Sequence, residues 1–257
     1  EIGSGLVGSE MCIRDRVYCV KFRVKSPVIV STPIHFDAIL SAVHPAMHNL
    51  NTVVRRSQAK DVVDAPLPID SAKIADTWVF CCSSADYSNA RPYCTKFTKR
   101  KAGLDYCYIK SRQTPRSGPG RDRCDTIYGV LCSSVDFFVS CGSVNELSRL
   151  CRRVHGIGGL RKMGFGEVTE FEIIERTDLQ WQDCLVRGGV AVRNLPVEMI
   201  VGQATRLVAT KHPYWLADHL RPGVEEGDAA ELREEVYLNE YIEYFKSRRT
   251  DKSKIIE

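Results

Sequence analysis

The chain of 257 residues lacks the short motifs that define several enzyme classes. It contains no Gly-x-Ser-x-Gly elbow, no His-Glu-x-x-His pair, no Walker Gly-Lys-Ser/Thr and no paired metal carboxylates. It also lacks an apolar run of the roughly 20 residues that a membrane-spanning helix needs. We therefore expect no catalytic residue, no cofactor and no membrane insertion.

Metal-ligand spacing is missing too, although the chain has eleven cysteines. No two of them form a Cys-x-x-Cys pair, and no Cys/His group has the spacing of a zinc site. No secretory signal peptide is recognisable, so a disulfide framework is not expected. We predict no metal site and interpret the cysteines as buried, reduced thiols of a prokaryotic cytoplasmic protein.

The chain lacks a large net charge, since the formal value is +4, but its charged residues are unevenly distributed along the sequence. Residues 91–125 hold ten Lys or Arg against three Asp, a balance of +7. Residues 222–244 hold eight Asp or Glu against one Arg, a balance of −7. The basic middle indicates a polyanionic partner, and the acidic tail indicates either a protein contact or a solvated helix face.

A glycine-rich basic loop spans 155–166, with a predicted helix before it and a predicted strand after it. This order differs from Walker and Rossmann loops, which open a helix. One alternative is a helix C-cap that runs into a tight turn. Five glycines around an Arg-Lys pair favour nucleic-acid contact instead, because backbone N–H groups and basic side chains suit phosphodiesters. The predicted nucleic-acid-binding residues here are Gly156, Gly158, Gly159, Arg161, Lys162, Gly164 and Gly166.

Hydrophobic periodicity predicts an α+β domain over 17–176. Alternation of apolar and polar residues predicts strands, and 3.6-residue spacing predicts helices, the second of which has Ser143 and Glu146 placed as a capping box. The resulting order is βαββαβ, the ferredoxin-like or RRM-type pattern. The predicted elements are strands at 18–24, 77–82, 135–140 and 165–174, and helices at 36–43 (which bends or restarts at Pro45) and 143–154.

A basic insert, a thumb, is predicted at 86–127. Within it, 93–98 and 106–110 could pair as a hairpin, followed by a loop at 111–125 rich in Arg, Pro and Gly. Aromatic residues interleave with the basic ones, as in proteins that stack on bases. The alternative is a solvated hairpin whose tyrosines simply pack. The predicted binding residues of the insert are Lys96, Lys99, Arg100, Lys101, Arg112, Arg116, Arg121 and Arg123.

The two ends of the chain fall outside this domain. Residues 1–16 resemble a translated sequencing-adapter fragment and are left out of the fold. Residues 177–257 form a C-terminal extension with a predicted strand at 207–209 and a predicted terminal helix at 229–249. Packing of that helix against the core is favoured over partner binding.

Several short strings together resemble the RAMP superfamily of CRISPR-associated proteins, in particular the Cas-five-like subunit of type IV effector complexes. Gly-Ile-Gly-Gly, four residues, then Gly-Phe-Gly resembles the glycine-rich loop of that superfamily. The other strings are Pro-Ile-His-Phe-Asp-Ala-Ile-Leu at 33–40, Asp-Ala-Pro-Leu-Pro-Ile at 64–69, Trp78 with Cys-Cys-Ser-Ser-Ala at 81–85, Arg-Asn-Leu-Pro at 193–196 and His-Pro-Tyr-Trp at 212–215.

This resemblance implies a non-catalytic subunit that binds the 5′ handle of the guide RNA (crRNA). The loop would hold the handle, with Arg161 and Lys162 on phosphates and His35 among the RNA-binding residues. The thumb would reach toward the first guide bases and a backbone subunit of the complex. Contact with target DNA, beside the short motif (PAM) that flanks it, is a further implication.

Two alternatives remain open from the sequence. A metal-independent endoribonuclease of the same superfamily would use a histidine as general acid or base, and the candidates are His35, His44, His48 and His155. A general RRM-type RNA-binding protein without a complex is the weaker alternative.

Overall fold

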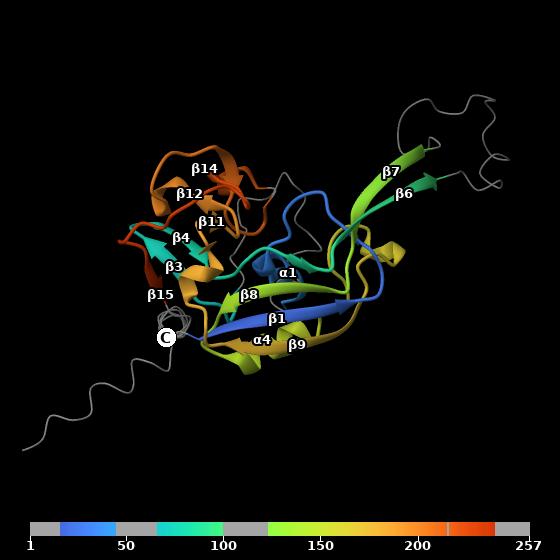
Figure 1. Ribbon diagram of the computed structural model, residues 1–257, viewed down its shortest axis with the longest axis horizontal. Helices are drawn as coiled ribbons and strands as arrows, with labels where there is room; N and C mark the ends of the chain where they lie inside the picture. The colour runs from blue at the N-terminus through green and yellow to red at the C-terminus, as the bar shows by residue number, and fades with distance from the viewer. Residues whose placement is uncertain (1–15, 45–65, 100–122, 215, 240–257) are drawn as a thin grey trace, which may run out of the picture.

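The computed structural model describes residues 16–44, 66–99, 123–214 and 216–239. The chain folds as a mixed α+β protein with mostly antiparallel sheets. Its first strand, β1 (Val17–Val24), lies at the centre of a four-stranded sheet of order β5-β8-β1-β9 (Figure 1). β1 pairs antiparallel with β8 (Ser134–Ser140) and β9 (Val168–Arg176), and β8 pairs with the short β5 (Asp86–Ser88).

Two helices bury one face of this sheet. α1 (Phe36–Val43) and α4 (Val144–Cys151) supply apolar side chains to a core that also contains Val20 and Phe22 of β1. The helix predicted at 143–154 is confirmed at its start, where the Ser143 hydroxyl accepts a hydrogen bond of 3.5 Å from the backbone N–H of Glu146, but it ends at Cys151, three residues earlier than predicted. Because α4 ends at residue 151, the chain is free to turn into the glycine-rich loop.

The described part of the predicted insert, 86–127, contains a twisted ribbon with a different strand pairing, and its first residues, 86–88, belong to the four-stranded sheet as β5. β6 (Arg91–Lys99) pairs antiparallel with β7 (Arg123–Leu131), and β2 (Val28–Ile29) joins β7 on its other edge. Figure 1 shows the ribbon projecting away from the four-stranded sheet. The predicted partner strand, 106–110, lies outside the described residues. The predicted loop at 111–125 is wrong at 123–125, which belong to β7, because the strand pattern of 126–131 extends back to them.

The second strand of the four-stranded sheet was predicted at 77–82, and this assignment is wrong. β4 (Thr77–Phe80) pairs with β3 (Ser71–Ile74) in a separate sheet, and only Cys82 makes an isolated bridge to Val139 of β8. β5 occupies the predicted place instead. The side chains of Val79 and Cys81 are buried in a second core. The apolar alternation of this segment therefore reflects a strand that packs on the second core and not on the core of the four-stranded sheet.

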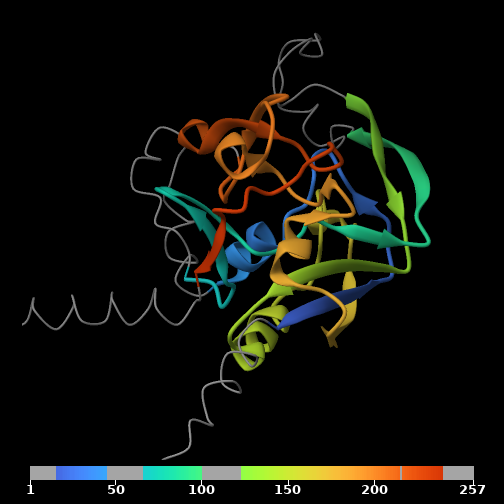
Figure 2. The ribbon, with the colours of Figure 1, turned by 60° about the vertical axis from the view of Figure 1, so that its left-hand side comes forward.

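This second core is built mainly from residues after 176. It draws on residues before that boundary too, because β15 (Tyr237–Asn239) pairs with β3, and Figure 2 shows these strands side by side. The strand predicted at 207–209 is confirmed. The remaining elements here are β10 (Val186–Arg187), β11 (Val190–Ala191), β12 (Leu195–Pro196), β13 (Arg206–Ala209), β14 (Leu220–Val224) and the 3-10 helices Trp181–Cys184, Val197–Met199 and Ala217–His219.

The terminal helix predicted at 229–249 is wrong over 229–239, and 240–249 lie outside the described residues. Ala229 and Leu232 form bridges to other segments, and β15 follows. The backbone N–H of Arg233 donates to the carbonyl of Met199, so it is not used inside a helix. The apolar spacing that indicated a helix face comes from an extended segment that places Ala230 and Val236 in the second core.

Nine of the eleven cysteines lie in the described residues, and all nine are free. Seven are buried, as predicted, and burial raises the pKa of the Cys141 and Cys151 thiols to about 12, so these thiols stay protonated. The prediction is wrong for Cys94 and Cys124, which lie on the exposed face of the ribbon. Among the described residues, no helix is long and apolar enough to cross a membrane.

Candidate nucleic-acid interface

The glycine-rich loop folds back on the segment that follows β1. The backbone N–H of Gly166 donates to the carbonyl of Pro27 at 2.8 Å, and that of Gly159 donates to the carbonyl of Ile29, also at 2.8 Å. Inside the loop, the N–H of Ile157 donates to the Gly166 carbonyl at 2.9 Å. These donors are therefore used within the protein, and they are not available for a phosphate.

Two of the five glycines are required by this close backbone packing. A Cβ atom at Gly166 would lie 1.9 Å from the Ile157 carbonyl oxygen, and one at Gly158 would lie 2.6 Å from that of Ile29. Both residues also have positive φ, at 61° and 88°. The alternative of a tight turn therefore explains part of the motif, and nucleic-acid binding is not needed to account for these two glycines.

The tip of the loop is different, because it faces outward. Leu160 and Gly164 both have left-handed backbone conformations, and they flank a 3-10 turn, Arg161–Met163. The side chains of Arg161 and Lys162 are exposed, and neither takes part in an ion pair with another described residue. The fold therefore presents two exposed cations on a short turn, and no described carboxylate forms an ion pair with either of them.

A cavity of about 330 Å³ lies beside this turn. Its walls come from the loop (Gly156 to Gly159 and Arg161), from residues 31–34, from α1 and from Tyr214. His35 also lines it, so the structure brings together the predicted loop residues and the predicted His35, which are more than a hundred positions apart in sequence. Sequence reasoning missed Tyr214 as a member of this site.

His35 is buried in a neutral form. Its ring stacks on Tyr214 with centroids 4.4 Å apart, and only 2% of the residue is exposed. Burial, reinforced by the nearby Arg193 guanidinium, lowers the pKa of His35 to about 3. Its Nδ1 atom has no hydrogen-bond partner among the residues that the structure describes. A histidine that stays neutral at physiological pH cannot supply positive charge to a phosphate, so the prediction that it binds RNA is limited to uncharged contacts.

Behind His35 lies a buried polar cluster. The Tyr214 hydroxyl bonds to both Asp37 carboxylate oxygens, at 2.8 and 3.0 Å, and the Arg193 guanidinium lies 3.8 Å from Asp37 and 3.0 Å from the Tyr214 hydroxyl. Arg193 also donates to the backbone carbonyls of Phe80, Cys82 and Thr210. Four of the resembling strings, 33–40, 81–85, 193–196 and 212–215, therefore meet at one place.

The ribbon has one exposed face and one partly covered face. Tyr93 lies on the covered face, with its ring centroid 6.3 Å from that of Phe165 in the loop, so the ribbon base packs beside the loop. Lys96 lies on the exposed face together with Tyr128, which is 67% exposed. Tyr128 is the register partner of Cys94, so it is a diagonal neighbour of Lys96 across the two strands. Tyr128 falls outside the predicted insert, yet it is the aromatic residue of the described ribbon best placed for base stacking.

The other predicted thumb residues fall at or beyond the ribbon's described end. Lys99 and Arg123 are partners in the strand register, at the last pair of β6 and β7. Arg100, Lys101, Arg112, Arg116 and Arg121 lie outside the described residues, so their predicted role stays a prediction.

Two candidate histidines of the nuclease alternative, His35 and His44, line different cavities. His155 is exposed at the start of the loop, whereas His44 lines a separate cavity, and His48 lies outside the described residues. Among the residues whose positions are described, no group of three or more His, Cys, Asp or Glu could hold a metal ion.

Comparisons with known proteins do not assign a family. No protein-family model and no curated protein matches the chain. The resemblance to CRISPR-associated proteins therefore rests on the short strings, and the function that it implies is a proposal.

Proposed function

We propose that this protein is a non-catalytic, crRNA-binding subunit of a type IV CRISPR ribonucleoprotein that caps the 5′ handle of the guide RNA. The main support is the geometry of one edge of the molecule. The loop exposes Arg161 and Lys162, which form no ion pair with a described residue, and the base of the ribbon packs beside the loop through Tyr93 and Phe165. Such an edge can follow a phosphate backbone with cations and contact bases with an aromatic side chain.

The topology of the four-stranded sheet supports a ferredoxin-like domain. If β1, β5, β8 and β9 are numbered as the four strands of a βαββαβ unit, their spatial order is second, third, first, fourth, with all neighbours antiparallel. The two helices follow the first and third strands and share one core. This arrangement supports the proposed RRM-type, ferredoxin-like fold.

The proposed mechanism is positional. Phosphates of the handle contact Arg161 and Lys162, and the ribbon directs Lys96 and Tyr128 toward the following nucleotides and a backbone subunit. Sequence recognition of the DNA target falls to guide pairing, while the protein recognises backbone shape and the short motif beside the target.

Neutralising the loop tip tests this proposal. The double variant Arg161→Ala/Lys162→Ala should bind a labelled handle-bearing RNA at least tenfold more weakly than wild type, because two charge-assisted phosphate contacts are lost. A plot of the logarithm of the binding constant against the logarithm of the salt concentration has a negative slope, and its magnitude should decrease by about 1.4 in the double variant. Fluorescence anisotropy at several salt concentrations measures both quantities.

The matched control removes an arginine and a lysine elsewhere, in Arg221→Ala/Lys73→Ala, where both residues lie in the sheets of the second core. Equal losses in the two double variants would show that only net charge matters, and this would contradict a role for the loop.

The nuclease alternative is favoured by one observation, the exposed His155 beside the loop. The same RNA is incubated with wild type and His155→Ala in the absence of metal ions, and the products are separated on a denaturing gel. The proposal predicts intact RNA in both reactions. Specific cleavage by wild type that is lost in His155→Ala would overturn the non-catalytic role.

A further inference from the structure

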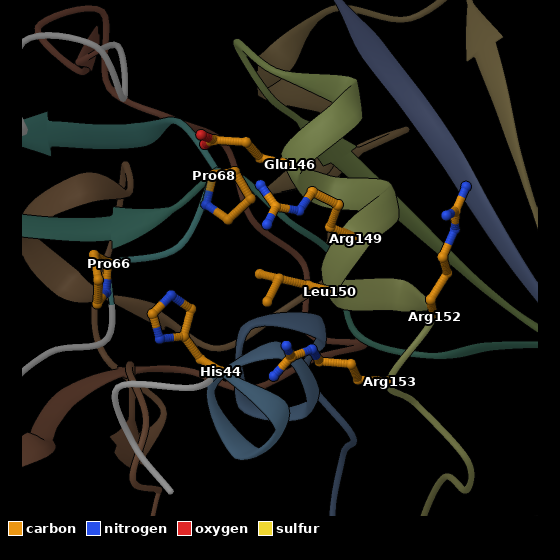
Figure 3. Close-up of a pocket in the computed structure, with 8 residues that line it drawn as sticks. All are labelled: His44, Pro66, Pro68, Glu146, Arg149, Leu150, Arg152 and Arg153. Atoms are coloured by element: carbon orange, nitrogen blue, oxygen red, sulfur yellow. The ribbon is translucent and has the colours of Figure 1, made fainter. Parts of the chain in front are cut away.

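A second cavity, of about 320 Å³, opens on the helical side of the protein, where it is lined by the end of α1, by α4 and by the segment leading into β3. Figure 3 shows that Arg149 reaches from α4 toward Pro68, and that Arg153, just beyond α4, extends toward His44. The side chains come from three separate parts of the chain. No residue of the glycine-rich loop contributes to the described lining.

The described wall of this cavity is mainly basic. Arg149, Arg152 and Arg153 are all exposed, and none of the ion pairs among the described residues involves them. Glu146 is the one carboxylate of the described lining. Figure 3 shows that Arg149 and Arg153 extend toward the hollow, whereas Arg152 extends away from it. The positive charges of Arg149 and Arg153 attract an anion that enters the hollow.

Stabilisation of the helix dipole explains only part of this arrangement. Basic side chains in the last turn of α4 favourably oppose the partial negative charge there, and Arg149 lies in that turn. Arg153 lies past the helix, and His44 comes from the end of another helix. The convergence of these groups on one hollow indicates ligand binding, because the dipole does not require it.

The rest of the lining is apolar. Pro66, Pro68 and Leu150 form flat or branched hydrocarbon surfaces beside the arginines. Guanidinium groups match phosphate oxygens in a bidentate geometry, and proline rings suit the face of a base or a ribose. A ligand that carries a phosphate next to a planar, weakly polar group fits this combination better than a lone inorganic anion does.

We infer that this cavity is a nucleotide-binding site, with the phosphate on Arg149 and Arg153 and the base or sugar against Pro66, Pro68 and Leu150. The nucleotide comes either from a nucleic-acid strand or from the free pool. The site is separate from the glycine-rich loop, so it stands independently of the proposed handle binding.

Calorimetric titration of the full chain tests the inference, with AMP, adenosine and inorganic phosphate as separate ligands. AMP should bind at least tenfold more tightly than either fragment. Arg149→Gln and Arg153→Gln should each weaken AMP binding about tenfold, while Arg221→Gln, an exposed arginine on β14, should leave it unchanged. Both positions are exposed, so two independent variants are available if one of them perturbs folding.

A ten-nucleotide single-stranded RNA, titrated in the Arg161→Ala/Lys162→Ala background, separates the two sources. Weaker RNA binding in the arginine variants assigns the site to a strand, and an effect on AMP alone assigns it to a free nucleotide. The inference is overturned if AMP binds no more tightly than adenosine, if no binding occurs at AMP concentrations up to about 10 mM, or if the arginine variants behave like Arg221→Gln. It is also overturned if the loop variant loses AMP binding, whereas the proposed function is unaffected by any of these results.

Discussion

At the scale of single residues, the loop glycines differ in whether the surrounding atoms leave room for a side chain. Gly166→Ala would place a methyl group on the Ile157 carbonyl and break a backbone pairing, so we expect a loss of about 3 kcal/mol or more in the free energy of unfolding. Gly164 also has positive φ, but apart from its two chain neighbours no described residue has an atom within 4 Å of its added Cβ. Gly164→Ala should therefore cost only about 1–2 kcal/mol. Urea denaturation measures both, and equal costs would contradict the described loop packing.

His35 gives the protein a defined sensitivity to acid. Its pKa is about 3 in the folded state and about 6.5 when unfolded. The unfolded chain therefore binds more protons between these values, so stability falls as the pH falls from 6.5 toward 3. We expect a loss of about 2 kcal/mol between pH 6.5 and 5 from this residue. Unfolding of wild type and His35→Gln across this range measures the effect, and parallel pH profiles would contradict it.

At the scale of secondary-structure elements, the ribbon carries a prediction that separates binding from folding. Tyr128→Ala should leave stability within about 0.5 kcal/mol of wild type, because the side chain is 67% exposed. It should weaken RNA binding about fivefold or more through loss of base stacking. Tyr237→Ala, which truncates an exposed tyrosine on β15, is the control. Similar RNA affinities for the two variants would exclude the ribbon face as a stacking surface.

The elements show where sequence periodicity is sufficient. β1, β8, α1 and α4 were predictable because each buries one face in the same core and has a clear local signal, such as the Ser143 cap. The pairing of β6 with β7 was not predictable, because the choice of partner strand depends on contacts outside the ribbon, where β2 and the loop pack against its base. The spacing of apolar residues at 229–239 resembles one face of a helix. In the structure this segment is extended, and the same residues are spaced as they are because they contact different parts of the second core.

The candidate site was predictable only in part, for a related reason. The loop motif located Arg161 and Lys162, whose exposure follows from the tight turn that the glycines permit. Nothing in the local sequence links Tyr214 to His35, since their stacking depends on tertiary packing across almost the whole described chain. The exposed position of Tyr128 likewise follows from strand register, which periodicity alone leaves open.

At the scale of the whole molecule, the Asp37–Arg193–Tyr214 cluster joins α1, which packs on the four-stranded sheet, to the C-terminal segments. Arg193→Met should lower the free energy of unfolding by about 3–5 kcal/mol, because it leaves the buried Asp37 carboxylate without its cation. The double variant Asp37→Asn/Arg193→Met should recover part of that loss. Chemical denaturation tests this coupling, and a cost below about 1 kcal/mol for Arg193→Met would contradict it.

The central claim is that RNA lies along the loop and the ribbon. Photo-crosslinking of a handle-bearing RNA containing 4-thiouridine, followed by mass spectrometry of the attached peptides, tests it most directly. The account predicts crosslinks in the peptide that contains Arg161 and Lys162 and in the β6–β7 ribbon. Crosslinks confined to the sheets of the second core, with none at the loop, would contradict it.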